Sequence, residues 1–383
     1  MVAVGIAAAV AGAAAPAAAD EVADPGVGGA AASGDAGDAA DDGDGAAWPA
    51  TATVDLQLFG GFTQRHTATE DDGAFELGRG ELGVRAPLGP RAGAELRLES
   101  LRSASPQSLF GIDGDSLVIR VKRAWGFVTA ETGPVRLEAR LGLVPDPWVE
   151  ALETGYPLRP VSPTLAERGG FFDTSDAGAT AIARYRDLAT VSVSVLNGEG
   201  RHQIEQNAGK NTTAVVAVSP WRGCLGVLGP ARLRVQLAAR DGSVGAGSAS
   251  DRRLAAAVTL AGDDVGVGAE AVQAFGFAGQ GGVDARGAGA WATAALWRRW
   301  LGGWVRYDRF DPDVDTGGDA RWVLSAGVWS EPSASRRGAL RVFAGVEHEG
   351  AGAGAGPFPG ATEAAEATRV LILMSADSSW GLP

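Results

Sequence analysis

Apolar and charged residues alternate in many stretches of the chain, and GPVRLEARLGLVP (133–145) is the clearest of them. Apolar side chains fall on one side of that stretch, and the charged side chains of Arg136, Glu138 and Arg140 fall on the other. A period of two residues predicts a β-strand with one apolar and one ionic face. The pattern alone leaves open whether the apolar face meets a protein core or lipid.

About sixteen segments of this kind follow Thr51, and no convincing helical period interrupts them. Most are about ten residues long or longer, near the length at which a tilted strand crosses a bilayer, whereas strands in soluble proteins run nearer five or six. The expected spans are 51–63, 74–86, 91–102, 115–130, 134–144, 175–186, 188–197, 211–219, 230–241, 250–261, 264–276, 285–299, 302–311, 319–330, 337–349 and 366–376.

The connections between these segments alternate in length. Tight turns such as 87–90 and 131–134 alternate with longer polar loops such as 241–251 and 278–284, and the link at 220–229 is longer than the rule allows. Short turns on one side and long loops on the other are typical of outer-membrane barrels, in which closure removes every unpaired strand edge. The sequence therefore predicts an all-β fold, a transmembrane antiparallel β-barrel of about 16 strands.

Large aromatic residues support the same prediction, because a membrane barrel carries aromatic girdles at its two interfaces. The alternative is that these rings fill the core of a soluble β-sandwich. The aromatic residues expected near strand ends are Trp125, Tyr185, Trp297, Trp300, Trp304, Tyr307, Trp322 and Trp329.

The N-terminal part of the chain differs in composition from the rest. Residues 1–19 are small and apolar and end in Ala17-Ala18-Ala19, which is typical of a secretory signal peptide, although the expected basic residue is missing. Residues 20–47 are mostly Ala, Gly and Asp and are expected to form a disordered linker. The barrel is assigned to 48–383.

The longest connection, PDPWVEALETGYPLRPVSPTLAERGGFFDT (145–174), joins expected strands five and six. A loop of about thirty residues is unusual and points to function. In sixteen-stranded general porins the loop at this position folds inward and narrows the channel, and this chain resembles them in that position. The alternative is a lid over the mouth or a contact with a neighbouring subunit. Its candidates for a constriction are Glu150, Glu153, Arg159, Glu167, Arg168 and Asp173.

Three short stretches, SDAGATAIARY (175–185), VSVLNGEG (193–200) and RYDRFDPD (306–313), resemble segments of the phosphate-selective porin O and P family and related Gram-negative porins. The resemblance implies a homotrimeric sixteen-stranded channel, surrounded by outer-membrane lipids, for passive diffusion of small hydrophilic solutes and of anions. Relatives specific for phosphate use lysine rings, but this chain has only Lys122 and Lys210, which argues against strict phosphate selectivity.

The expected strand faces also name charged residues that would line the lumen. An excess of arginine there favours anions through the local field, while the alternative is that interleaved Glu and Arg pair with one another on a wet wall. The pore-lining candidates on strands are Arg97, Arg120, Lys122, Arg136, Glu138, Arg140, Arg232, Arg234 and Arg306.

Other functions have weaker support in the sequence. The histidines His66, His202 and His348 lie in no recognisable Ser–His or Asp–His setting, so we expect no catalytic residue, and no cofactor or metal site. Acidic stretches at 69–73 and 311–319 are interpreted as solvated turns rather than Ca²⁺ loops. No basic stripe suggests nucleic acid. The remaining alternative is a barrel plugged by its loops that acts as a surface receptor or adhesin.

Overall fold

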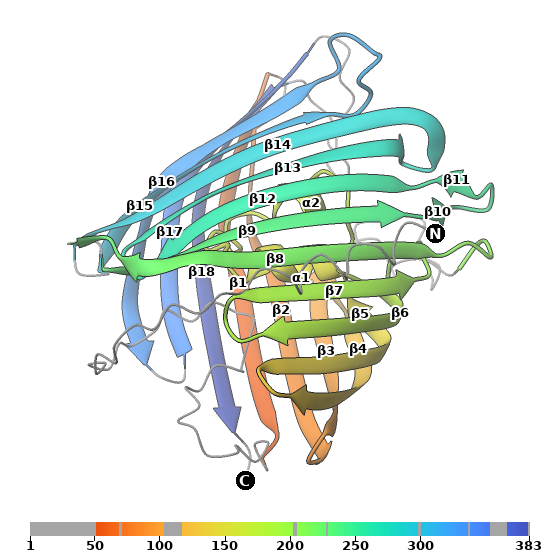
Figure 1. Cartoon of the computed structure of the whole chain (residues 1–383). Helices are drawn as coiled ribbons and strands as arrows, with labels where there is room; N and C mark the ends of the chain where they lie inside the picture. The colour runs from red at the N-terminus through yellow and green to blue at the C-terminus, as the bar shows by residue number, and fades with distance from the viewer. Residues whose placement is uncertain are drawn as a thin grey trace.

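Sixteen strands close into one antiparallel barrel in the computed structural model of the chain (Figure 1). The structure describes residues 51–68, 71–102, 117–201, 205–226, 229–297, 300–335, 338–352 and 366–381. The signal peptide (1–19) and linker (20–47) lie outside the described residues and stay predictions, as does the assignment of 48–383 to one domain.

Successive barrel strands pair with one another, and β1 pairs with β18 to close the sheet. The connection between β9 and β12 carries a small separate hairpin, and the connection between β5 and β6 carries two short helices. The elements are β1 (Thr53–Thr67), β2 (Asp71–Gly89), β3 (Ala92–Arg102), β4 (Leu117–Thr132), β5 (Val135–Pro145), α1 (Pro147–Glu153), α2 (Leu165–Arg168), β6 (Ser175–Tyr185), β7 (Ala189–Leu196), β8 (Asn211–Cys224), β9 (Pro230–Asp241), β10 (Ser243–Val244), β11 (Ala249–Ser250), β12 (Arg252–Gly262), β13 (Val265–Phe277), β14 (Gln280–Trp297), β15 (Leu301–Asp311), β16 (Arg321–Ser335), β17 (Gly338–Ala351) and β18 (Glu366–Gly381). No described helix is long and apolar enough to span a membrane.

The sixteen predicted segments are confirmed, and three predicted connections are wrong. The connection expected over 64–73 is limited to 68–70, because β1 continues to Thr67 and β2 begins at Asp71. The link at 220–229 is a short turn because β8 continues to Cys224, through a bulge at which Pro220 needs no ladder hydrogen bond. The loop at 278–284 is a two-residue turn, since Ala278 and Gly279 both have positive φ (51° and 76°) and β14 begins immediately afterwards.

The outer face of the barrel is apolar and the inner face is polar, the reverse of a soluble protein. On β5, Leu141 is 70% exposed on the outside, while Glu138 and Arg140 are each 4% exposed on the inside. Exposed leucine and valine side chains continue around the wall on the other strands. This confirms the predicted orientation of the amphipathic strands, with their apolar faces on the lipid side.

One bulge changes the face of half a strand. The register of β3 and β4 shifts between Arg97 and Leu98, so that Lys122 and Arg123 both point into the barrel. Trp125 and Phe127 follow on the inner face, where they are each 4% exposed. Uninterrupted alternation from Lys122 would place these two rings on the opposite face, so the bulge decides their orientation.

The aromatic girdle is therefore only partly as predicted. Trp125 and Trp304 are buried inside the barrel and belong to no interface. Trp297 and Trp300, at the turn between β14 and β15, are 68% and 58% exposed, as a girdle requires.

We expect a charge on the outer face to destabilise the barrel. Leu141→Arg puts a guanidinium into lipid, and it should lower the free energy of unfolding from a bilayer by about 2–4 kcal/mol near the midplane. Gln57→Arg is the matched control, because Gln57 lies on the inner face opposite Glu81 and Asp377, and it should change that free energy by about 0.5 kcal/mol or less. Equal effects in urea-induced unfolding from vesicles would contradict the assignment of the two faces.

Candidate channel constriction

The connection between β5 and β6 folds into the barrel, and its residues 146–174 are called the inner loop here (Figure 1). The Asp146 carboxylate begins α1 by accepting hydrogen bonds from the backbone N–H groups of Trp148 (2.9 Å) and Val149 (3.4 Å). Pro147 occupies the first turn, where no N–H is needed. Thr164 caps α2 in the same way. The inward direction of this loop, predicted from its length and position, is confirmed.

Apolar packing holds the inner loop against one wall of the barrel. Trp148, Val149, Leu152, Phe171 and Phe172 are buried against apolar side chains on the inner face of β8–β16. Many of those partners are alanines, which leave room for the helices. Burying a large apolar side chain contributes about 1.5–3 kcal/mol, so this contact fixes the position of the loop.

Polar contacts with β13 and β17 also hold the inner loop in place. The Glu270 carboxylate on β13 accepts hydrogen bonds from the backbone N–H groups of Leu165 (2.5 Å) and Ala166 (3.3 Å). Arg168 forms two hydrogen bonds of 3.1 Å with Glu347 on β17. These contacts extend the attachment of the loop from the apolar wall to the neighbouring strand β17.

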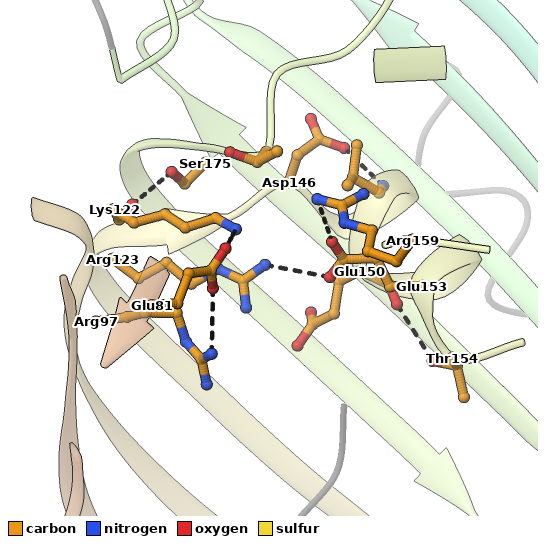
Figure 2. A network of polar contacts seen from close by, with 12 residues as sticks. Glu81, Arg97, Lys122, Arg123, Asp146, Glu150, Glu153, Thr154, Arg159 and Ser175 are labelled. Atoms are coloured by element: carbon orange, nitrogen blue, oxygen red, sulfur yellow. Dashed lines mark hydrogen bonds and ion pairs between the residues drawn. The ribbon is translucent and has the colours of Figure 1, made fainter. Parts of the chain in front are cut away.

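The charged face of the inner loop meets a charged wall formed by β2, β3 and β4 (Figure 2). On the wall, Glu81 binds Lys122 (2.5 Å) and Arg97 (3.2 Å). Across the lumen, Arg123 of β4 reaches Glu153 of α1 at 3.4 Å.

The chain of ion pairs continues within the loop. Glu153 binds Arg159 at 2.7 Å, and Arg159 also binds Glu167. Together these side chains form what we call the constriction cluster: Arg79, Glu81, Arg97, Lys122, Arg123, Glu153, Arg159 and Glu167.

The cluster is shielded from water at its centre and open at its edges. The Lys122 and Glu81 side chains are each 2% exposed. Further along the inner face, Arg120 is 30% exposed, Arg184 is 27% exposed and Glu150 is 35% exposed. Charged side chains on the barrel wall and on the inner loop therefore keep contact with solvent at the edges of the cluster.

A second ion-paired group lies on β5 and β6, beside the start of the loop. Arg140 binds Glu138 at 2.5 Å and Glu150 at 2.8 Å, and Arg184 binds Glu138 at 3.0 Å. Of the charged residues of β5, Glu138 and Arg140 therefore lie beside the inner loop, bound in ion pairs, whereas Arg136 lies near the turn between β4 and β5.

The remaining predicted residues lie partly beside the inner loop and partly away from it. Arg120 binds Glu99 at 2.5 Å, and Arg306 donates to Tyr156 and to the Pro163 carbonyl of the inner loop. Asp173, near the end of the inner loop, binds Arg201 at 3.0 Å. Two others are distant from the constriction. Arg232 donates to the Asp187 carbonyl in a short turn, and Arg136 lies near the turn between β4 and β5. Arg234 is half-buried on β9.

Two members of the constriction cluster were missed by the sequence reasoning. Arg79 alternates with Glu81 on β2, so period-two alternation around Glu81 could have found it. Arg123 could not be found this way, because only the bulge next to Lys122 turns it inward.

Two carboxylates of the inner loop, Glu153 and Glu167, have lowered pKa values. Burial alone would raise the pKa of Glu167, but the neighbouring Arg159 outweighs it and lowers that pKa to about 2, with further help from Arg79 and Lys122. Arg159 and Arg123 likewise lower the pKa of Glu153 against the effect of burial. The paired loop thus stays charged over the neutral pH range.

Each of the two described histidines, His66 and His348, contacts one polar side chain. His66 lies 2.9 Å from Asp71, an Asp–His contact that sequence spacing did not reveal, and the two side chains are 46% and 70% exposed. His348 contacts Thr368 at 2.9 Å, and His202 lies outside the described residues. In the part of the chain that the structure describes, no group of three or more His, Cys, Asp or Glu could hold a metal ion.

Comparison with solved structures supports the fold at low sequence identity. The anion-selective porin from Comamonas acidovorans has a TM-score of 0.56 at 13% identity, covering 86% of this chain and 100% of that chain. OmpT of Vibrio cholerae has a TM-score of 0.55 at 11% identity (86% and 98% covered). OprB of Pseudomonas putida has a TM-score of 0.54 at 10% identity (86% and 93% covered).

No family model and no curated protein matches the chain. The structural likeness therefore establishes that this chain has the closed barrel fold of outer-membrane porins. The narrower resemblance to the phosphate-selective porins stays a prediction.

Removing a large loop anchor should loosen the inner loop. Trp148→Ala leaves a cavity where a fully buried ring packs against the barrel wall. It should lower the free energy needed to open the inner loop by about 3–5 kcal/mol. Amide hydrogen exchange of residues 146–174 should accelerate while the strands stay protected. Trp300→Ala, on the exposed outer face, is the matched control. Unchanged exchange in the loop would show that its packing is not what holds it.

The ion pair of Glu167 should make loop closure sensitive to acid. Its folded pKa of about 2 lies below the ordinary 4.5, so its stabilisation is full above about pH 4.5 and is lost as pH falls toward 2. Hydrogen exchange of the inner loop should therefore be flat from neutral pH to about 4.5, after correction for the intrinsic rate, and then accelerate. Glu167→Gln should weaken this dependence; a variant with the same acid profile as the native chain would refute the assignment.

Proposed function

We propose that this chain is an outer-membrane channel through which small hydrophilic solutes diffuse passively. The observation that carries the proposal is the inner loop, held across a closed barrel with its ion-paired face toward the wall of β2–β4. A loop evolved only to fill the barrel would be expected to present apolar side chains on both faces, whereas this one is apolar on one face and charged on the other. This function requires no catalytic residue, cofactor or metal.

The surroundings of the barrel fit this proposal. Exposed apolar side chains on the outer face suit the acyl chains of membrane lipids. The long connections lie at one rim, although the β1–β2 and β13–β14 links at that rim are short, and by analogy with other outer-membrane barrels this rim faces the outside of the cell. OmpT of Vibrio cholerae has been solved in a trimer form, and by analogy we propose a homotrimer here.

The charges support a modest preference for anions. In the constriction cluster, the cations Arg79, Arg97, Lys122, Arg123 and Arg159 meet the acids Glu81, Glu153 and Glu167, with Asp55 bound to Arg97 at 2.8 Å. The cations are therefore in slight excess, and arginine can bind carboxylate or phosphate with two parallel hydrogen bonds. Strict phosphate specificity has no support, because Lys122 is buried and paired.

A second candidate is a barrel closed by its inner loop that serves as a surface receptor or adhesin. The burial of the central ion pairs favours it, since Lys122, Glu81 and Arg306 have side chains only 2% exposed. The two candidates differ in whether ions can pass through the barrel beside the inner loop.

Planar-bilayer recording of the purified full chain tests the channel. We expect ohmic conductance in three equal steps per insertion event, and a reversal potential under a salt gradient that indicates anion preference. Well-folded protein without any conductance would overturn the channel and favour the receptor.

Charge variants in the same recording test whether cations on the inner face of the barrel set the ion selectivity. Arg120→Gln with Arg184→Gln removes two water-exposed inner-face cations, and it should shift the reversal potential toward cation preference. Arg222→Gln is the matched control, because this arginine is 74% exposed next to a short turn. An equal shift in both proteins would place the selectivity outside the lumen.

A further inference from the structure

The rim of the barrel at which β1 begins carries an excess of arginine, and we call it the basic rim. The connections from β2 to β3, β4 to β5, and each later pair out to β16 and β17 lie at this rim. Those at the opposite rim, the inner loop excluded, hold ten acidic residues against two arginine or lysine residues, so the two rims differ in sign. The charged residues in the connections of the basic rim are Arg91, Arg186, Arg298, Arg299, Arg336 and Arg337, with Asp187, Asp263 and Asp264.

Three arginines at the basic rim form no ion pair with any described residue. Arg91 and Arg186 are exposed in the turns that follow β2 and β6. Arg85, near the end of β2, packs its guanidinium 4.6 Å from the centre of the Phe127 ring. Because that ring lies on the inner face of the barrel, Arg85 faces the lumen just inside the mouth. The rim therefore presents cations that nothing in the described chain neutralises.

The segment that precedes β1 has the opposite charge. Residues 20–47 include eight acidic residues and no lysine, arginine or histidine. Only residues 48–52 separate this segment from β1, whose first residue, Thr53, lies opposite Arg85 on β2. The acidic segment is therefore tethered at the basic rim. A short tether gives an effective concentration of about 1 mM, so ion pairs that are weak one at a time together favour the bound state.

The anionic headgroups of lipids are the competing partner for these arginines. They can reach exposed cations such as Arg91 on the outer edge of the rim. They cannot reach Arg85, because its packing on Phe127 and, at 5.7 Å, on Trp125 places it inside the barrel wall. A segment that enters the mouth from β1 meets both kinds of arginine, so the acidic segment fits the whole rim better than lipid does.

We propose that residues 20–47 bind the basic rim and lie across the mouth of the barrel. Their carboxylates then meet Arg85, Arg91 and Arg186, and they set a negative potential at this entrance. Anions that enter from this side are repelled, so the segment opposes the anion preference of the inner face. The binding itself requires only the closed barrel and the tether at β1, and it holds whether or not the barrel conducts ions.

The single cysteine of the chain provides a way to detect this contact. Cys224 is exposed at the end of β8, at the basic rim. Six strands separate β8 from β1 on one side of the barrel and eight on the other, so Cys224 lies across the mouth from the tether. A barrel of this size is roughly 30 Å wide, and the chain from Ser33 to Thr53 spans at most about 70 Å. A cysteine at position 33 can therefore reach Cys224.

Disulfide formation in the purified full chain with Ser33→Cys, under a copper–phenanthroline oxidant in detergent, tests the proposal. The matched control adds Asp→Asn at 35, 38, 41, 42 and 44, which keeps the length and reach of the segment. Each rate is divided by the rate at which the same protein reacts with a small neutral thiol reagent. The acidic segment should form the intramolecular disulfide about tenfold faster than the control at low salt. The difference should disappear at 1 M salt, where the Debye length is about 3 Å.

Rim variants test the other half of the contact. Arg91→Gln with Arg186→Gln, in the chain that carries Ser33→Cys and the native acids, should slow the disulfide about threefold or more. These two side chains are exposed and form no ion pair with described residues, so their loss leaves the barrel intact. Planar-bilayer recording gives a second readout: the five Asp→Asn changes alone should shift the reversal potential further toward anions.

Equal normalised rates for the acidic and the neutralised segment at low salt would overturn the proposal, and that comparison changes no residue of the barrel. Disulfides between two chains in place of the intramolecular product would also overturn it, because the segment would then bind another copy. A conducting barrel whose reversal potential ignores the five Asp→Asn changes would refute the position across the mouth. The disulfide measurement needs no conductance, so failure of the channel and failure of this contact are distinguished.

Discussion

An open sheet exposes a row of unpaired N–H and C=O groups at each edge, and lipid offers no partner for them. In this chain β1 and β18 remove both edges by pairing along their whole length, from Thr53 with Gly381 to Thr67 with Ala367. Everything else depends on that closure. It separates an inner face from an outer face, and it encloses the space into which the connection after β5 folds.

The enclosed space is divided asymmetrically. The wall formed by β8–β16 presents small and aromatic side chains and binds the apolar face of the inner loop. The wall formed by β2–β4 presents arginine, lysine and glutamate and meets the charged face of the loop. The constriction cluster therefore results from one amphipathic loop placed between an apolar wall and an ionic wall. Its charges are held in fixed positions because they bind one another, which limits the net field on this side of the loop.

Much of this arrangement follows from local pattern. Alternation identified the strands because side chains on a strand point to opposite faces, and a barrel with lipid outside and water inside repeats that contrast on every strand. The loop between β5 and β6 was recognisable from its length. Its charged residues Glu153, Arg159 and Glu167 were also recognisable, and the structure brings them together as ion pairs, while their role at a constriction stays a prediction.

The sequence by itself determined the strand order, the lipid-side face and the loop that enters the barrel, since each depends on neighbours along the chain. Only the tertiary structure decided which charges meet. The bulge beside Lys122 turns Arg123 inward and Trp125 with it, and the folding of the inner loop into the closed barrel brings Arg168 of α2 to Glu347 of β17. Such contacts depend on register across the sheet, and a shift of one residue reverses the face of every side chain that follows.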